Sequence, residues 1–189
     1  MKLRKDRMLR ASVMGLIAIT CVGCDGGGMA PIQTVASVDI PRFMGNWYVI
    51  ACIPTRIERN AYRAVESYRL RPDGRIDTVF TFREGSFDGP LKTYHPTGFV
   101  KPDGAGAVWG MQFVWPVQAD YRILYLDADY TMTVIGRQRR DYAWIMARAA
   151  AIAPDDYDRL VGLLKAQGYE VTGLRLVPQQ DGHEPTERH

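Results

Sequence analysis

Short β-prone runs follow one another along most of this 189-residue chain, and the connections between them are too short to hold a crossover helix. The runs occupy residues 46–53, 64–71, 75–82, 92–100, 107–115, 120–127, 131–136 and 142–148. Turn signals separate them, and Pro72-Asp73-Gly74 has the composition of a hairpin turn. This spacing predicts an antiparallel meander that closes as a barrel or packs as a sandwich.

One helical pattern follows the strands, at residues 154–169. Its apolar side chains recur at i, i+3, i+4 and i+7 and form a single stripe: Tyr157, Leu160, Val161 and Leu164. Pro154 suits the first turn of a helix, and Gly168 suits the position just after its end. A helix with one apolar stripe is expected to lie against the outside of the β-structure, before a short ninth strand at residues 174–178.

The first residues are typical of a bacterial export signal. A basic start precedes the apolar run Ala11–Thr20, which is shorter than the about 20 residues that span a bilayer. Cleavage before Cys24, after the small Gly23, is preferred to cleavage before Cys21. The stretch resembles a lipoprotein lipobox, although Cys21 stands where Leu is usual, and this resemblance implies lipidation of Cys24. An ordinary cleaved signal is the alternative.

The expected organisation is a lipoprotein signal peptide at residues 1–23, a flexible tether at 24–40, one domain at 41–178 and a disordered tail at 179–189. The formal charge of +3 is modest, so nothing indicates a nucleic-acid partner. The basic segment Gly136–Tyr142 is interpreted as a solvated hairpin turn, with binding of phosphate headgroups as the alternative.

Cysteine and histidine usage argues against redox and metal chemistry. Once Cys21 is removed and Cys24 is acylated, only Cys52 remains, and it has no partner for a disulfide. Strict alternation from Trp47 places Cys52 on the opposite strand face, as a half-buried thiol that behaves like a small hydrophobe. The three histidines are scattered, and we expect no metal and no cofactor.

The run at residues 107–115 places four large side chains on one face by the period of two: Trp109, Met111, Phe113 and Trp115. An eight-stranded barrel has room either to pack such residues completely or to hold one small ligand among them. Both interpretations stay open from the pattern alone. Pro96, inside another run, indicates a bulge or an edge there.

Three motifs occur in a characteristic order. They are Gly45-Asn46-Trp47-Tyr48, the segment 126–136 with Asp127, Asp129 and Tyr130, and the segment 142–148 that ends in Arg148. Together with the helix that follows, they resemble the lipocalins, and most closely the bacterial lipocalins, which are outer-membrane lipoproteins related to apolipoprotein D. The resemblance covers residues 41–178. It implies an all-β fold, an eight-stranded antiparallel up-and-down β-barrel with one C-terminal α-helix packed outside and a short ninth strand.

The resemblance also assigns structural roles to these motifs. Trp47, after Gly45, would close the base of the barrel, with the Arg148 guanidinium stacked on its indole. Asp127 or Asp129 would accept hydrogen bonds from backbone N–H groups in its turn, beside Tyr130.

Ligand binding is expected at the open end and in the interior of the barrel. The candidate residues are Trp109, Met111, Phe113, Tyr125, Phe99, Tyr68 and Glu66. If Glu66 points inward, it places a carboxylate in the cavity with a raised pKa; we favour a position at the rim or outside. A ligand-free, filled core is the alternative for the apolar residues.

The resemblance implies a membrane-anchored protein that binds a fatty acid or lysophospholipid for lipid transport, storage or envelope maintenance. Its partners would be that lipid and the membrane, through Cys24, with the domain in the periplasm as a monomer or weak homodimer. The family favours the outer membrane, whereas Asp25 resembles an inner-membrane retention signal. We expect no enzymatic activity. The alternatives are an isomerase-type enzyme that uses Glu66 and His95, and a ligand-free structural barrel.

Overall fold

The computed structural model describes residues 30–179. The predicted signal peptide, Cys24, Asp25 and most of the predicted tail lie outside the described residues. Within residues 30–179, no helix is long and apolar enough to span a bilayer.

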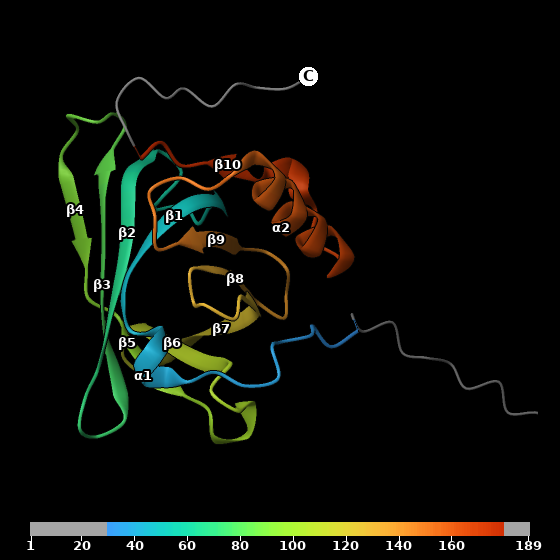
Figure 1. Ribbon diagram of the computed structural model, residues 1–189. Helices are drawn as coiled ribbons and strands as arrows, with labels where there is room; N and C mark the ends of the chain where they lie inside the picture. Colours follow the sequence, from blue (N-terminus) through green and yellow to red (C-terminus); the bar gives the residue numbers. More distant parts are fainter. Residues whose placement is uncertain (1–29, 180–189) are drawn as a thin grey trace, which may run out of the picture.

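The described residues form one antiparallel sheet that closes on itself (Figure 1). Its strands are β1 (Gly45–Ile53), β2 (Ala61–Leu70), β3 (Arg75–Glu84), β4 (Leu91–Tyr94), β5 (Thr97–Val100), β6 (Val108–Val114), β7 (Val117–Leu126), β8 (Met132–Gly136), β9 (Ala143–Ala147) and β10 (Arg175–Leu176). Neighbours in sequence pair from β1 to β9, except that β4 and β5 both pair with β3, and β9 pairs back with β1. The predicted eight-stranded up-and-down barrel is therefore confirmed.

The fourth barrel strand is split at Pro96, as the sequence predicted. β4 and β5 are its two halves, and the Pro96 carbonyl accepts a hydrogen bond from Thr78 N at 3.1 Å. Proline has no N–H to donate to the ladder, so the strand breaks where it occurs. β10 is the predicted ninth strand and pairs with β1 outside the closed ring.

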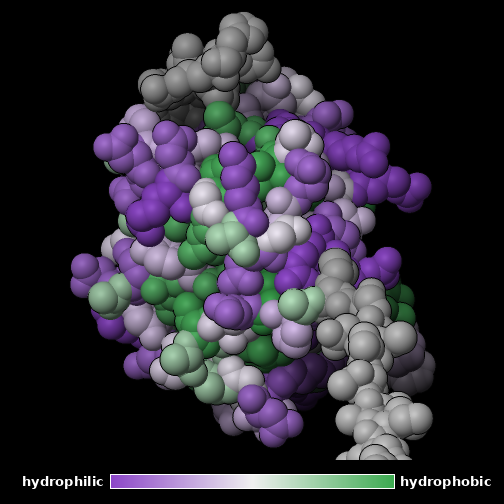
Figure 2. Space-filling model, turned by 90° about the vertical axis from the view of Figure 1, so that its right-hand side faces the viewer, coloured by the Kyte–Doolittle hydropathy of each residue, from purple (hydrophilic) through white to green (hydrophobic). Residues whose placement is uncertain are grey.

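Three short helices and one longer helix complete the fold around the barrel. α1 (Ile40–Phe43) precedes β1, η1 (Pro102–Gly104) lies between β5 and β6, and η2 (Val171–Gly173) precedes β10. The main helix, α2 (Pro154–Ala166), covers one flank of the barrel (Figure 1). Leu160 and Leu164 of its apolar stripe are fully buried against residues of β1, β8 and β9. Outside this contact, hydrophilic side chains cover much of the flank (Figure 2).

Trp47 and Arg148 close the barrel at the end where β1 starts and β9 finishes. The Arg148 guanidinium carbon lies 3.8 Å from the centre of the buried Trp47 ring. The same guanidinium donates to the carbonyls of Asn46 at 2.7 Å, Met44 at 2.8 Å and Phe43 at 3.0 Å. Gly45 adopts φ +95°, and a Cβ there would lie 3.3 Å from Arg148 Nη1. One arginine thus joins α1, β1 and β9.

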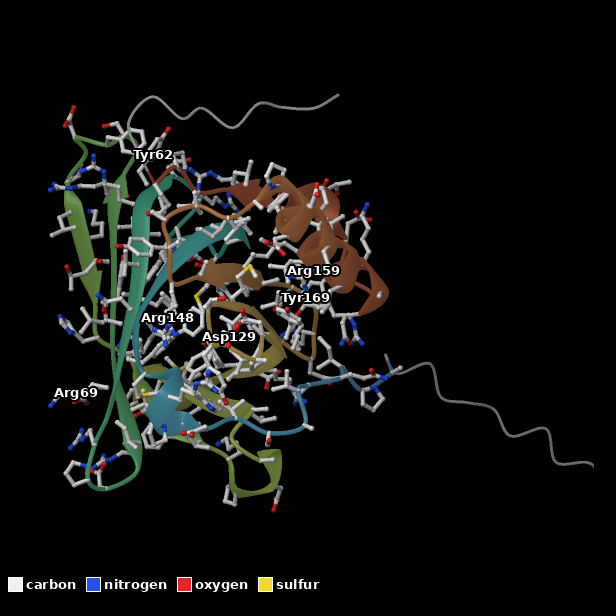
Figure 3. The ribbon with its side chains drawn as sticks, in the orientation of Figure 1. Tyr62, Arg69, Asp129, Arg148, Arg159 and Tyr169 are labelled. Carbon is white, nitrogen blue, oxygen red and sulfur yellow. The ribbon has the colours of Figure 1, made fainter. Side chains whose placement is uncertain are left out.

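The turn between β7 and β8 lies at the same closed end, and Figure 3 labels Asp129 in it, near Arg148. Asp127, rather than Asp129, accepts the backbone hydrogen bonds of this turn: its carboxylate accepts from Thr131 N at 2.7 Å and from Met132 N at 2.9 Å. Burial opposes its ionisation, but these bonds hold the pKa of Asp127 below its ordinary value. Tyr130 completes the motif, because its hydroxyl accepts from Asp39 N at 2.9 Å.

A β-bulge in β1 changes the predicted faces of that strand. The pairing with β9 shifts between Val49 and Ala51, so Ala51 packs in the outer cluster beneath α2 and Cys52 faces the barrel interior with Trp47. Cys52 is therefore buried inside the barrel, which corrects the strict alternation expected from sequence. Burial, with the nearby Glu58 carboxylate, raises the pKa of the Cys52 thiol to about 12. The thiol stays protonated and unreactive at neutral pH.

The start of the described chain also differs from the flexible tether expected at residues 24–40. Residues 30–39 lie along the barrel, with Ile32 and Val38 buried. Ile32 N donates to Gln138 Oε1 at 3.0 Å, and Val38 N donates to the Ala105 carbonyl at 3.0 Å. This segment runs from the β8–β9 turn at the open end to the β5–β6 connection at the closed end.

We expect Arg148→Ala to lower the free energy of unfolding by about 2–4 kcal/mol, because it leaves several carbonyls at the closed end without a charged donor. Urea denaturation should show a lower midpoint at an unchanged slope. Arg69→Ala is the matched control. Arg69 pairs with Asp77 at 2.6 Å, but its side chain is 80% exposed, so this change should stay within about 0.5 kcal/mol. Equal losses in both variants would contradict this role of Arg148.

Candidate functional site

A cavity of about 340 Å³ occupies the open half of the barrel. Its inner wall is mostly apolar and comes from five strands: Phe80, Met111, Ala119, Tyr121, Ile135 and Met146. Its mouth is formed by the β1–β2 connection and the start of the β8–β9 turn, which contribute Thr55, Arg56, Ile57, Glu58 and Arg137. The volume lies at the lower end of the range of about 300–1,000 Å³ typical of small-molecule sites.

Three of the candidate ligand residues line this cavity. Met111 lies in the wall, Phe113 lies at the mouth, and Glu66 faces the interior. The inward position of Glu66 corrects our preference for the rim or the outside. Period-two alternation along β2 already placed Glu66 on the face of Tyr68, and Tyr68 is buried in the core.

Trp109 and Tyr68 do not line the cavity; both are buried and pack next to Tyr121, which does. The Trp109 ring stacks on Tyr121 at a centroid distance of 5.0 Å and meets Phe43 edge-on at 5.5 Å. Tyr68 lies edge-on to Trp109 at 5.7 Å. Both interpretations of the aromatic run therefore hold in part: the closed half of the barrel is filled, and the open half is hollow.

Tyr125 does not line the cavity, because a bulge shifts the faces of β7. The pairing of β7 with β8 changes register between Ile123 and Tyr125. Ile123 points into the barrel, whereas Tyr125 packs in the outer cluster, with the Arg159 guanidinium of α2 5.1 Å from its ring centre. Figure 3 shows Arg159 on the flank that α2 covers. This placement corrects the inward orientation expected from alternation.

Phe99 also faces away from the cavity. Its neighbour Gly98 points inward, where an added Cβ would lie 3.2 Å from Ile76 Cβ and 3.3 Å from Met111 Sδ. The next residue along the strand therefore points outward. Because Gly98 has no side chain on the inner face, the Trp109 and Met111 side chains occupy the space beside it. The strand breaks at Pro96, so the alternation before the break does not say which residues of β5 face inward. The sequence pattern alone therefore could not place Phe99.

A polar network crosses the cavity floor. The Tyr68 hydroxyl donates to the Glu66 carboxyl and lies 2.8 Å from the Tyr121 hydroxyl. Burial raises the pKa of Glu66 to about 8, and repulsion from Glu58 raises it further in the same direction. Burial also raises the pKa of Tyr121 well above its ordinary value, and Glu66 adds to this effect. Glu66 is therefore mostly a neutral carboxylic acid at pH 7, which can donate a hydrogen bond.

The mouth carries a second carboxyl group and a guanidinium with one unpartnered nitrogen atom. Glu58 accepts from Thr55 N at 2.8 Å and from Trp144 Nε1 at 3.2 Å, and burial raises its pKa. The Thr55 side chain also interacts with the Glu58 carboxyl group. Arg137 Nε is buried and has no hydrogen-bond partner among the described residues, and Arg137 Nη1 lies 3.5 Å from Asp141. Buried polar groups normally have partners, so the Arg137 guanidinium indicates a place near the mouth for a polar ligand group.

Several cavity residues were not singled out from the sequence: Phe80, Ala119, Ile135, Met146 and Trp144. Alternation within their runs gives each strand two faces, but it does not say which face is inner. Pairing to a strand of known orientation would have resolved this, as when Ala119 pairs with Met111. The mouth residues of the β1–β2 connection have no periodicity, so no sequence signal identified them.

Other chemistries are not assembled in the described part of the chain. No group of three or more His, Cys, Asp or Glu side chains there is arranged to hold a metal ion. His95 is exposed at the break between β4 and β5 and does not line the cavity, so it forms no acid–base pair with Glu66.

Residues 38–179 match the family of the Lipocalin-like domain. The chain belongs to the lipocalin family. Among lipocalins, Temperature-induced lipocalin-1 of Arabidopsis thaliana is 32% identical over 160 residues, which cover 79% of this chain and 84% of the plant protein. Outer membrane lipoprotein Blc of Citrobacter freundii is 28% identical over 148 residues, 78% of this chain and 83% of that protein.

The solved structure of insecticyanin from the tobacco hornworm Manduca sexta is similar in fold. It superposes with a TM-score of 0.64 at 15% sequence identity and covers 82% of this chain and 88% of the insect protein. At this identity the likeness supports the lipocalin fold alone. The resemblance stated from the three sequence motifs is thereby confirmed.

The raised pKa of Glu66 predicts a pH-dependent stability. Glu66 ionises near pH 4.5 in the unfolded chain but near pH 8 in this lipocalin, so the folded state holds the proton between these values. The free energy of unfolding should therefore fall as the pH rises from 4.5 to 8. Glu66→Gln, which cannot ionise, should remove this slope and be more stable than wild type at pH 8 by roughly 2 kcal/mol.

Urea denaturation at several pH values measures this difference. Glu84→Gln is the control, because Glu84 is an exposed carboxylate that pairs with Lys92 at 3.1 Å. Parallel pH profiles for wild type and Glu66→Gln would show that Glu66 ionises normally in the folded protein.

Proposed function

We propose that this lipocalin binds one single-chain amphiphile, such as a fatty acid or a lysophospholipid, in the barrel cavity. The observation that carries the proposal is a mostly apolar cavity with two arginines, Arg56 and Arg137, at its mouth. The wall offers Met111, Met146, Phe80 and Ile135 to an alkyl chain. Burial of methylene groups against such a wall contributes about 0.8 kcal/mol each.

The cavity suits one chain better than two. Its volume of about 340 Å³ is near the lower limit for ligand sites, and Trp109 and Tyr68 block further penetration toward the closed end. The Tyr68–Glu66–Tyr121 network leaves a few polar groups at the depth that the end of an alkyl chain would reach.

The charged head of the ligand belongs at the mouth. Arg56 and Arg137 both line this part of the cavity, and Arg137 Nε has no hydrogen-bond partner among the described residues. A guanidinium is suited to carboxylate and phosphate, which both present paired oxygens. An amphiphile that binds with its head at the mouth and its tail in the cavity therefore has a suitable environment for both halves.

We place the protein in the bacterial cell envelope, anchored through an acylated Cys24. The lipobox-like sequence before Cys24 supports this location, as does the similarity to a protein named outer membrane lipoprotein. Two or more acyl chains hold a protein firmly to a bilayer. Carriage or storage of a lipid ligand, in envelope maintenance, needs no cofactor and no reaction at the site.

Ala119→Phe tests the proposal by filling the cavity. Ala119 lines the wall next to Met111, its register partner on the neighbouring strand, so a phenyl ring there takes the space of the ligand tail. We expect the affinity for a fluorescent fatty-acid probe to fall at least about tenfold, which corresponds to about 1.4 kcal/mol. Displacement of the probe by unlabelled fatty acid gives the affinity in each variant.

Gln118→Phe is the control, because Gln118 lies on the same strand but is exposed and contacts Lys101 outside the barrel. The methyl ester of the same fatty acid tests the head, and it should displace the probe less well than the acid. Unchanged affinity in Ala119→Phe, with the variant folded, would exclude the cavity as the binding site. Chemical turnover of the bound lipid that Glu66→Gln abolishes would favour an enzyme.

A further inference from the structure

The large hydrophobic side chains that are exposed in the described residues gather at one end of the barrel. Six of the seven surround the cavity mouth and are here called the open rim: Ile57, Leu91, Phe113, Val114, Trp115 and Val117. The seventh, Leu70, lies at the closed end and is 38% exposed. A random scatter of surface hydrophobes needs no explanation, but a concentration around one opening does.

The β6–β7 hairpin forms the most prominent part of the open rim. Val114 pairs with Val117, and Trp115-Pro116 forms the tip between them. Trp115 is 82% exposed, Val114 71% and Val117 68%. Hairpin tips are normally built from glycine, asparagine, aspartate and other polar residues, and a run of exposed apolar residues is a fault unless a partner covers it.

The open rim is continuous with the candidate binding site. Ile57 and Phe113 belong to the rim and also line the cavity mouth. A partner that covers the rim therefore also covers the entrance through which a ligand passes.

Cationic side chains accompany the apolar ones. Arg56 and Arg59 lie on either side of Ile57 in the β1–β2 connection, both are exposed, and neither has an ion pair among residues 30–179. Apolar side chains with arginines beside them match the two layers of a phospholipid surface, with acyl chains beneath and phosphates above. The same pattern suits a protein partner less well, because exposed arginines there would need matching carboxylates.

The start of the described chain lies at the same end. The Ala30 carbonyl accepts from Arg140 Nη2 at 2.9 Å and from Gln138 Nε2 at 3.2 Å, and both donors belong to the β8–β9 turn beside the mouth. Five residues lie between Cys24 and Ala30, and the six Cα–Cα steps that join them reach at most about 20 Å. An acyl anchor on Cys24 would hold the open end, and not the closed end, near the membrane.

We propose that the open rim is a membrane-docking surface, on which the β6–β7 tip enters the headgroup region of a phospholipid bilayer and the cavity mouth faces the lipid. Arg56 and Arg59, which lie on either side of Ile57, contact lipid phosphates. The orientation argument from Cys24 rests on the proposed anchor, whereas the argument from the exposed side chains does not. Ligand then passes between cavity and bilayer without crossing water.

The test uses the full protein, extracted from its own membrane and reconstituted into vesicles of phosphatidylcholine and phosphatidylglycerol with brominated acyl chains. Bromine quenches tryptophan emission only at close range. The chain has four tryptophans, and Trp47 and Trp109 are fully buried inside the barrel. We expect bromolipid to quench wild-type emission, and Trp115→Phe to reduce the quenched fraction by about threefold or more, because the inserted side chain is gone.

Leu70→Trp combined with Trp115→Phe is the matched control, since it moves an exposed tryptophan to the opposite end of the barrel. This double variant should be quenched no more than Trp115→Phe alone. Quenching of the double variant to the wild-type level would overturn the orientation. Equal quenching of wild type and Trp115→Phe would overturn insertion of the tip, with the signal coming from lipid near the remaining tryptophans.

A second copy of the chain is the other possible cover for the open rim. A wild-type dimer that Trp115→Phe dissociates in sedimentation experiments, with no quenching by bromolipid, would overturn membrane docking. Ligand binding in the cavity is measured separately, as the affinity for the fatty-acid probe. Loss of quenching with unchanged probe affinity disproves the docking surface alone, whereas quenching of Trp115 with no probe binding supports docking and contradicts ligand binding.

Discussion

The stacking of Arg148 on Trp47 gives the barrel one closed end, and the rest of the molecule depends on that asymmetry. The guanidinium donates to four carbonyls of the segment that enters β1, while its carbon lies 3.8 Å from the centre of the indole ring. With Phe43, Trp109 and the other aromatic rings packed above it, the closed half has no room for a ligand. The cavity therefore occupies the open half of the barrel.

Sequence alone was sufficient for the fold and for the closed end, because these depend on repeating or local features. Strand spacing gave the meander, and Gly45, Trp47, Asp127 and Arg148 occupy the positions that the motifs implied. The interior was predictable only as far as alternation continues without interruption. Bulges in β1 and β7 reversed the faces of Cys52 and Tyr125, and a bulge leaves no mark in a periodic pattern of hydrophobic residues.

The chemistry of the cavity follows from burial more than from any motif. Glu66 is an acidic residue, yet its enclosure beside Tyr68 raises its pKa and keeps it mostly neutral at pH 7. Near the mouth, Arg56 and Arg137 provide positive charge where a lipid head would lie. The mouth thus offers charged groups to a lipid head, whereas the inner wall is mostly apolar.

Native mass spectrometry of the protein taken from its own membrane tests ligand binding most directly. The account predicts one non-covalent single-chain lipid per protein, lost on mild activation, in addition to any acyl groups attached at Cys24. Tandem fragmentation would identify a fatty acid or lysophospholipid as the released species. A wild-type protein that carries no such lipid, and takes up none when fatty acid is added, would contradict ligand binding in the barrel.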